Sequence, residues 1–170
     1  MAVEERLTRI RGLLKGIPGP LGNGEILARV DPGDVDSMPQ DVLGLIVGAV
    51  ERLERWTPTG SRDAIPRDEA DLMTKLTEVD EAEGTKTLVW LLSSTMAYRA
   101  GGRYTESKAR DVVETLTRLL GYGARWWSNT DLGDYPSAWP YSPVTQHTMS
   151  AVVVAVSNGV IVTVLAVDED

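Results

Sequence analysis

His147 is the residue best suited to acid–base chemistry, and it is the only histidine in the chain. A serine hydrolase set can be assembled around it, with Ser142 or Ser150 as nucleophile and Asp131 or Asp134 orienting the imidazole. The Gly-x-Ser-x-Gly turn that presents a nucleophilic serine in many hydrolases does not occur in the sequence. We therefore interpret His147 as a structural or surface residue and expect no catalytic residues.

Carboxylates are the second candidate for chemistry, because the chain carries 25 Asp and Glu residues. Glycoside hydrolysis needs only two carboxylates at a suitable separation, and a chain this acidic offers such pairs by chance. Two short windows supply oxygen ligands of the kind that Ca²⁺ prefers: Asp31, Asp34 and Asp36, and then Glu78, Asp80, Glu81 and Glu83. Neither window has the EF-hand spacing, and with no cysteine in the chain thiolate sites are excluded. We expect no metal and no cofactor.

Aromatic side chains gather between residues 126 and 141, where the sequence places Trp126, Trp127, Tyr135, Trp139 and Tyr141. Large rings can pack a loop onto the core. Tryptophan and tyrosine are also the usual anchors of protein interfaces, and stacked rings can hold a flat ligand such as a sugar. Both the packing role and the binding role stay open, and in the binding role we expect Trp126, Trp139 and Tyr141 to be the anchors.

A dense acidic stretch runs from residue 63 to residue 83. Its members include Asp68, Asp71, Glu78, Asp80 and Glu81, with few basic residues between them. A solvated helix face is one explanation, since acids near a helix N-terminus are favourable. The other explanation is an acidic surface that steers and selects a basic partner.

The overall charge favours an acidic, protein-binding surface over a nucleic-acid-binding one. The formal net charge is −8, whereas nucleic-acid binding needs clustered Lys and Arg. The first residues include Glu4 and Glu5 where a secretory signal carries bases, and no apolar run approaches the roughly 20 residues of a membrane helix. We therefore expect a cytoplasmic protein that binds neither nucleic acid nor a membrane.

Helical periodicity dominates the first 121 residues. Apolar residues at intervals of three and four predict helices over 2–15, from Ser37 as N-cap to just before Pro58, from Pro66 through Val79, over 86–100 and over 106–120. Gly84 interrupts the third pattern. Thr105 and Gly121 fit the two ends of the last helix. We interpret the Pro- and Gly-rich segment 17–34 as loop, including residues 25–30.

The C-terminal part predicts β-structure. Residues 124–128 resemble a strand, and two β-branched runs, 151–156 and 160–167, are joined through Asn158-Gly159, a strong signal for a two-residue hairpin. A register that sets Ser157 opposite Val160 makes both faces of this hairpin apolar. We expect it to lie centrally, with helices on at least one face and other strands or a partner on the second.

These patterns predict one α+β domain over residues 1–170, mainly helical over 1–121, with an aromatic loop and hairpin over 122–170. About five helices pack against a small antiparallel sheet contributed mainly by residues 124–167. The function we expect is that of a small acidic module that binds a basic protein, as an immunity or inhibitor protein binds a toxin or nuclease. Two alternatives are a small-molecule-binding or enzymatic domain with a pocket under the aromatic loop, and a self-assembling structural protein, for instance a homodimer.

Overall fold

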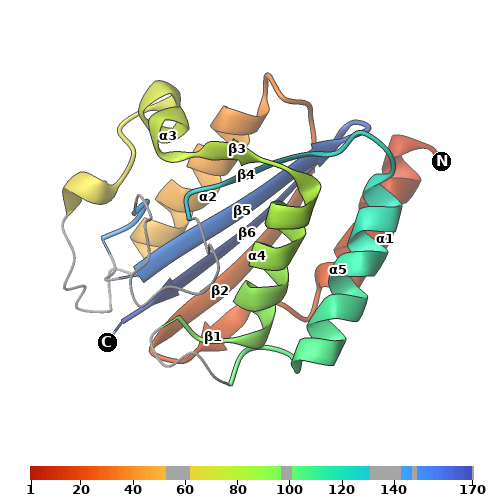
Figure 1. Ribbon diagram of the computed structural model, residues 1–170. Coiled ribbons are helices and arrows are strands. Elements are labelled where there is room, and N and C mark those ends of the chain that lie inside the picture. The colour runs from red at the N-terminus through yellow and green to blue at the C-terminus, as the bar shows by residue number, and fades with distance from the viewer. Residues whose placement is uncertain (53–61, 97–100, 131–142, 147–148, 170) are drawn as a thin grey trace.

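The computed structural model describes residues 1–52, 62–96, 101–130, 143–146 and 149–169. It is an α+β fold in three layers, with helices on both faces of one six-stranded sheet (Figure 1). The elements are, in chain order, α1 (Val3–Leu14), β1 (Gly19–Leu21), β2 (Gly24–Pro32), α2 (Met38–Arg52), the 3₁₀ turn η2 (Arg62–Ala64), α3 (Glu69–Lys75), β3 (Thr77–Val79), α4 (Glu81–Ser93), α5 (Glu106–Leu120), β4 (Arg125–Ser128), β5 (Met149–Ser157) and β6 (Val160–Asp168).

The sheet has the strand order β1-β2-β6-β5-β4-β3, and every neighbouring pair is antiparallel. Strand β2 pairs along the whole of β6, with Ile26 opposite Ala166 and Val30 opposite Val162. The prediction of a loop over 25–30 is therefore wrong. Turn-forming residues flank that segment, and its strand character depends on pairing with β6, a partner more than 120 positions away.

The C-terminal hairpin confirms the predicted register throughout, from Ser157 opposite Val160 to Ala151 opposite Ala166. Both turn residues have positive φ, 49° at Asn158 and 81° at Gly159, as a type I′ turn requires. Asn158 also donates a hydrogen bond from Nδ2 to the Leu120 carbonyl, which ties the turn to the end of α5. The hairpin lies centrally, and helices of the same chain cover both of its faces (Figure 1).

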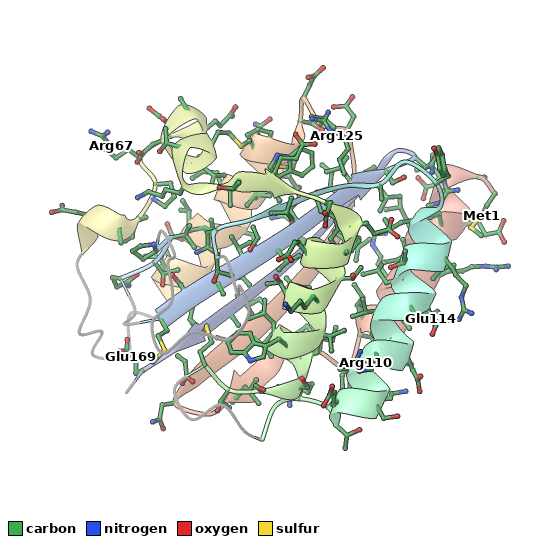
Figure 2. The ribbon with its side chains drawn as sticks, viewed as in Figure 1. Met1, Arg67, Arg110, Glu114, Arg125 and Glu169 are labelled. Carbon is green, nitrogen blue, oxygen red and sulfur yellow. The ribbon has the colours of Figure 1, made fainter. Side chains whose placement is uncertain are left out.

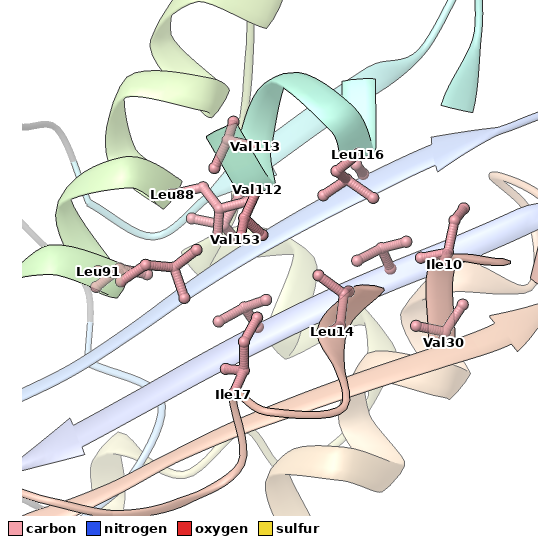
Figure 3. Packing of buried hydrophobic residues seen from close by; sticks show 14 of the residues in the cluster. Ile10, Leu14, Ile17, Val30, Leu88, Leu91, Val112, Val113, Leu116 and Val153 are labelled. Atoms are coloured by element: carbon pink, nitrogen blue, oxygen red, sulfur yellow. The ribbon is translucent and has the colours of Figure 1, made fainter. Parts of the chain in front are cut away.

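One face of the sheet packs against α1, α4 and α5. The outer sides of these helices are charged, and Figure 2 shows Arg110 and Glu114 of α5 directed away from the molecule. Their inner sides meet the sheet in a continuous apolar cluster that includes Ile10, Leu91 and Leu116 (Figure 3). Burying one such side chain contributes about 1.5–3 kcal/mol, so this layer supplies much of the stability.

The other face of the sheet packs against α2 and α3. Its cluster joins Val42 and Ile46 of α2 and Leu72 of α3 to sheet residues that include Val154 and Leu165. Two separate cores therefore lie on either side of the hairpin, which explains why the hairpin is apolar on both faces.

The predicted third helix is too long at its C-terminal end. Helix α3 ends at Lys75, Leu76 has extended backbone angles, and residues 77–79 form β3 beside β4. Pairing with β4 overrides the helical spacing of Leu76 and Val79.

Gly84 does not interrupt a helix, because α4 begins at Glu81 and includes it. A Cβ at residue 84 would lie 2.7 Å from ring carbons of Trp126, so glycine lets the helix approach the sheet closely. The fourth helix was predicted to run to residue 100, but α4 ends at Ser93. Residues 97–100 of the predicted helix lie outside the described part of the chain.

The ends of α5 confirm the prediction, since the Thr105 side chain accepts a hydrogen bond from the Lys108 N–H and Gly121 follows the last turn with φ 78°. At the start of α2, Asp34 has the role that we predicted for Ser37. Its carboxylate accepts hydrogen bonds from the N–H groups of Asp36 and Ser37, and the Ser37 hydroxyl bonds the Asp34 backbone. The last predicted turn of this helix lies outside the described residues.

None of the helices in the described part of the chain has the length and apolar character that crossing a membrane requires.

Candidate functional site

The two tryptophans of β4 lie in the interior, one on each face of the sheet. Trp126 is 1% exposed and packs under α4, whereas Trp127 is 4% exposed and packs with α2 and α3. The expectation that they contact a partner is corrected, because a side chain buried in the core presents no surface. Alternation along β4 is the physical reason, since both faces of this strand are covered.

The remaining predicted aromatic residues, Tyr135, Trp139 and Tyr141, lie outside the described residues, as does His147. Ser150, one of the two serines considered beside His147, is buried in β5. Its Oγ accepts hydrogen bonds from the N–H groups of Val144 and Thr145, at 3.0 and 3.3 Å. This hydroxyl joins the segment before the hairpin to the sheet.

The predicted acidic residues gather around β3 and the helices on either side of it, and two of them are helix caps. Asp68 accepts a hydrogen bond from the Asp71 N–H at the start of α3, and Asp80 accepts one from the Glu83 N–H at the start of α4, both at 2.8 Å. These carboxylates satisfy N–H groups that the first helical turn leaves unpaired.

Two further acids of this group make ion pairs. Glu78 accepts two hydrogen bonds from Arg125, at 2.7 and 2.9 Å, and these lower the pKa of its carboxyl. The same guanidinium lies over the Trp127 ring. Asp71 accepts a hydrogen bond from the Arg67 N–H, which lowers the pKa of that carboxyl as well.

Glu69 and Glu81 are exposed, as Asp68, Glu78 and Asp80 also are, and unlike Asp71 and Glu78 they make no ion pair with the rest of the described chain. They lie in the first turns of α3 and α4. These two carboxylates are available for contacts outside the chain.

Negative charge is concentrated in one stretch of the chain. Residues 31–83 hold fourteen of the acidic residues and five of the Lys and Arg residues, while the rest of the chain holds eleven and twelve. The whole of the net charge therefore comes from the segment that contains α2, α3, β3 and the start of α4. We call this segment the acidic layer; it forms α2 and α3 on one face of the sheet, β3 at the sheet edge and the start of α4 on the other face.

A compact charged group joins the acidic layer to the sheet. Arg29 and Asp31 share the α2-facing side of β2, and the Arg29 guanidinium bonds Asp31 and lies 3.5 Å from Oδ1 of Asp41 on α2. Burial, a hydrogen bond to the Asp31 carboxyl and the charge of Asp31 raise the pKa of Asp41 from 3.8 to about 6, against the opposing effect of Arg29.

The sequence reasoning did not single out Asp41 or Arg29. A local signal exists, because Arg29 and Asp31 have the two-residue spacing that puts both on one face of a strand. It carries information only once residues 24–32 are recognised as a strand.

No group of three or more His, Cys, Asp or Glu side chains among the described residues is arranged to hold a metal ion. Comparison of the chain with family models, curated proteins and solved structures gives no match.

Proposed function

We propose that this chain is a protein-binding module whose acidic layer recognises a basic protein, in the manner of an immunity or inhibitor protein that neutralises a toxin or nuclease. The observation that carries the proposal is the segregation of charge along the chain: residues 31–83 carry a net charge of −9 and the other residues together carry +1. An even distribution of acids would serve solubility alone, whereas an uneven distribution of charge gives an electric field with a direction. Such a field accelerates association with an oppositely charged partner and orients it.

The fixed ion pairs and helix caps support this role. Capping and pairing hold Asp68, Asp71, Glu78 and Asp80 in place, so their charges need little reordering when a partner arrives. The exposed carboxylates of Glu69 and Glu81 are then the groups able to form direct charge contacts.

Capture from the native organism's lysate tests the proposal. The immobilised chain should retain one basic protein in a one-to-one ratio at low salt and release it at high salt, because ion pairs at an interface are screened. The E69Q/E81Q variant should retain less of that protein.

The matched control is E4Q/D111N, which removes two exposed acids from α1 and α5 and changes the net charge equally. This control should retain the basic protein as the unmodified chain does. Equal loss in both variants, or no basic protein retained by any of them, would contradict the proposal.

A further inference from the structure

The sheet has an open edge along most of β2. Strand β1 pairs only with residues 24–26 of β2, and its last contact sets Gly19 opposite Ile26. Residues 27–32 pair with β6 on one side, and no strand among the described residues pairs with their other side. The backbone N–H and C=O groups of an open edge can bond a strand of another molecule. Whether those groups are free therefore decides whether two copies of the chain can join their sheets.

The strand register shows which backbone groups of β2 face the open side. The turn that joins β5 to β6 has two residues, so Val160, which follows it, is hydrogen-bonded to β5. Hydrogen bonds to the two neighbouring strands alternate along β6, and the positions bonded to β2 are those opposite Arg29 and Asp31. Ala28 and Val30 are one residue out of step with these, so their backbone N–H and C=O groups point toward the open side.

Arg11 of α1 occupies the Val30 carbonyl on this open side. Figure 3 shows Val30 beside Ile10 of α1, and the next residue of the helix reaches the strand edge. Nε and Nη2 of Arg11 donate hydrogen bonds to the Val30 carbonyl oxygen, at 3.0 and 2.9 Å. A carbonyl oxygen has two lone pairs, and this side chain takes both. Val30 therefore offers no acceptor to another strand.

The part of the edge that belongs to β1 is protected in a similar way. The turn between β1 and β2 also has two residues, and by the same alternation the Pro20 carbonyl points outward. Pro20 has no N–H to offer, and its carbonyl accepts a hydrogen bond from Nη2 of Arg103 at 3.0 Å. Proline and basic side chains are common means of protecting an open sheet edge. Two arginines from distant parts of the chain thus bond outward carbonyls of one edge.

We propose that Arg11 keeps the chain monomeric by preventing β2 from pairing with the β2 of a second copy. Antiparallel pairing about a two-fold axis would set Ala28 of each copy opposite Val30 of the other and form four backbone hydrogen bonds. Two of the four need the Val30 carbonyl, one in each copy, and Arg11 occupies both. The proposal concerns the sheet edge and does not depend on the acidic layer.

Electrostatic repulsion alone does not account for the protection of this edge. The two Arg29 side chains would meet at the two-fold axis, where like charges oppose pairing. Each guanidinium, however, bonds Asp31 of its own strand and lies 3.5 Å from Oδ1 of Asp41 on α2. These carboxylates balance the charge of Arg29, so the occupied Val30 carbonyl is the main obstacle to pairing.

Sedimentation of the full chain, from micromolar to near-millimolar concentration, tests the proposal. Arg11→Met keeps an apolar stem against the sheet but loses both donors, and it should lower the dissociation constant of the dimer at least 10-fold. Arg9→Met is the matched control, because Arg9 lies on the same helix and pairs with Glu5. The control and the unmodified chain should stay monomeric. Arg11→Ala removes the same donors, and thermal unfolding checks that each variant folds. A folded Arg11 variant that stays monomeric would overturn the proposal.

A second substitution identifies the surface through which the dimer forms. Ala28→Pro removes an N–H on the open side without breaking a bond to β6, which an edge strand tolerates. Added to Arg11→Met, it should restore the monomer. In the Arg11→Met dimer, hydrogen exchange should slow at the amides of Ala28 and Val30 and stay unchanged at Arg29, which already bonds β6. A dimer that survives Ala28→Pro, or that leaves exchange at Ala28 and Val30 unchanged, forms elsewhere and contradicts the role of Arg11.

Discussion

At the scale of single residues, the close contacts of this fold depend on side-chain size in ways that sequence composition does not reveal. Gly84 and Trp126 come from different elements, and their contact sets the distance between α4 and the sheet. Gly12 in α1 makes no such contact. Two helical glycines of the same chain should therefore respond oppositely to the same substitution.

We predict that Gly84→Ala destabilises the fold by about 1–3 kcal/mol, because the added methyl group must displace the Trp126 ring or the helix. Gly12→Ala should stabilise it by about 0.5–1 kcal/mol through helix propensity alone. Urea unfolding monitored by tryptophan fluorescence measures both changes. If the two variants shift the midpoint in the same direction, the close packing of α4 on Trp126 is wrong.

The Asp31–Asp41 pair predicts an unusual dependence of stability on pH. Because folding raises the pKa of Asp41 from 3.8 to about 6, the folded chain holds more protons than the unfolded chain between those values. Stability should therefore fall as pH rises through this window, by about 1–2 kcal/mol, a figure lowered for the partial solvation of the carboxyl. The lowered pKa values of Asp71 and Glu78 have the opposite effect, because they make stability rise as pH rises, and they do so only at lower pH.

Asp41→Asn should abolish the loss of stability between pH 4 and pH 6 and raise the free energy of unfolding at pH 7. Asp36→Asn changes a nearby exposed acid outside the pair, so this variant should still lose stability between pH 4 and pH 6. Urea unfolding at a series of pH values makes the comparison. Parallel pH profiles for the two variants would show that the pKa of Asp41 is not raised in the folded chain.

At the scale of elements, a side chain makes the hydrogen bonds of the sheet beyond the end of strand β4. Strand β4 ends at Ser128, opposite Val153, but β5 begins four residues earlier at Met149. The buried Asn129 side chain bridges the difference, since its Nδ2 donates to the Ser150 carbonyl and its Oδ1 accepts from the Val152 N–H, at 2.9 and 2.8 Å. One amide group thereby takes the place of a strand residue.

Asn129→Ala should destabilise the fold by about 2–4 kcal/mol, because it leaves a buried N–H and a buried carbonyl of β5 without partners. Hydrogen exchange at the Val152 amide should accelerate more than exchange at Val162 of the neighbouring strand. Unchanged protection at Val152 would mean that the Asn129 side chain does not hold β5.

Elements that depend on neighbouring residues could be predicted from the sequence, and elements that depend on distant ones could not. The hairpin register follows from Asn158-Gly159 and the helix over 106–120 from its own caps, all of them local signals. Strands β2 and β3 owe their conformation to β6 and β4, so residues 25–30 and 77–79 carry no sufficient local signal. For the same reason the burial of Trp126 and Trp127 became clear only with both helical layers in place.

At the scale of the whole molecule, charge is unevenly distributed among the elements. Helices α1 and α5 carry balanced charges on their outer surfaces, whereas residues 31–83, which include α2, α3, β3 and the start of α4, carry the net negative charge. A solubility role does not require this separation. The recognition of a basic surface that we propose would account for it, because steering depends on a directed field.

The salt dependence of binding to the basic protein retained in the capture experiment tests this account most directly. Titration calorimetry at a series of NaCl concentrations should show affinity falling as salt rises for the unmodified chain and for E4Q/D111N. For E69Q/E81Q we predict both a weaker affinity at low salt and a shallower dependence, because fewer charge contacts remain to be screened. Identical salt profiles for the three proteins would contradict recognition through the acidic layer.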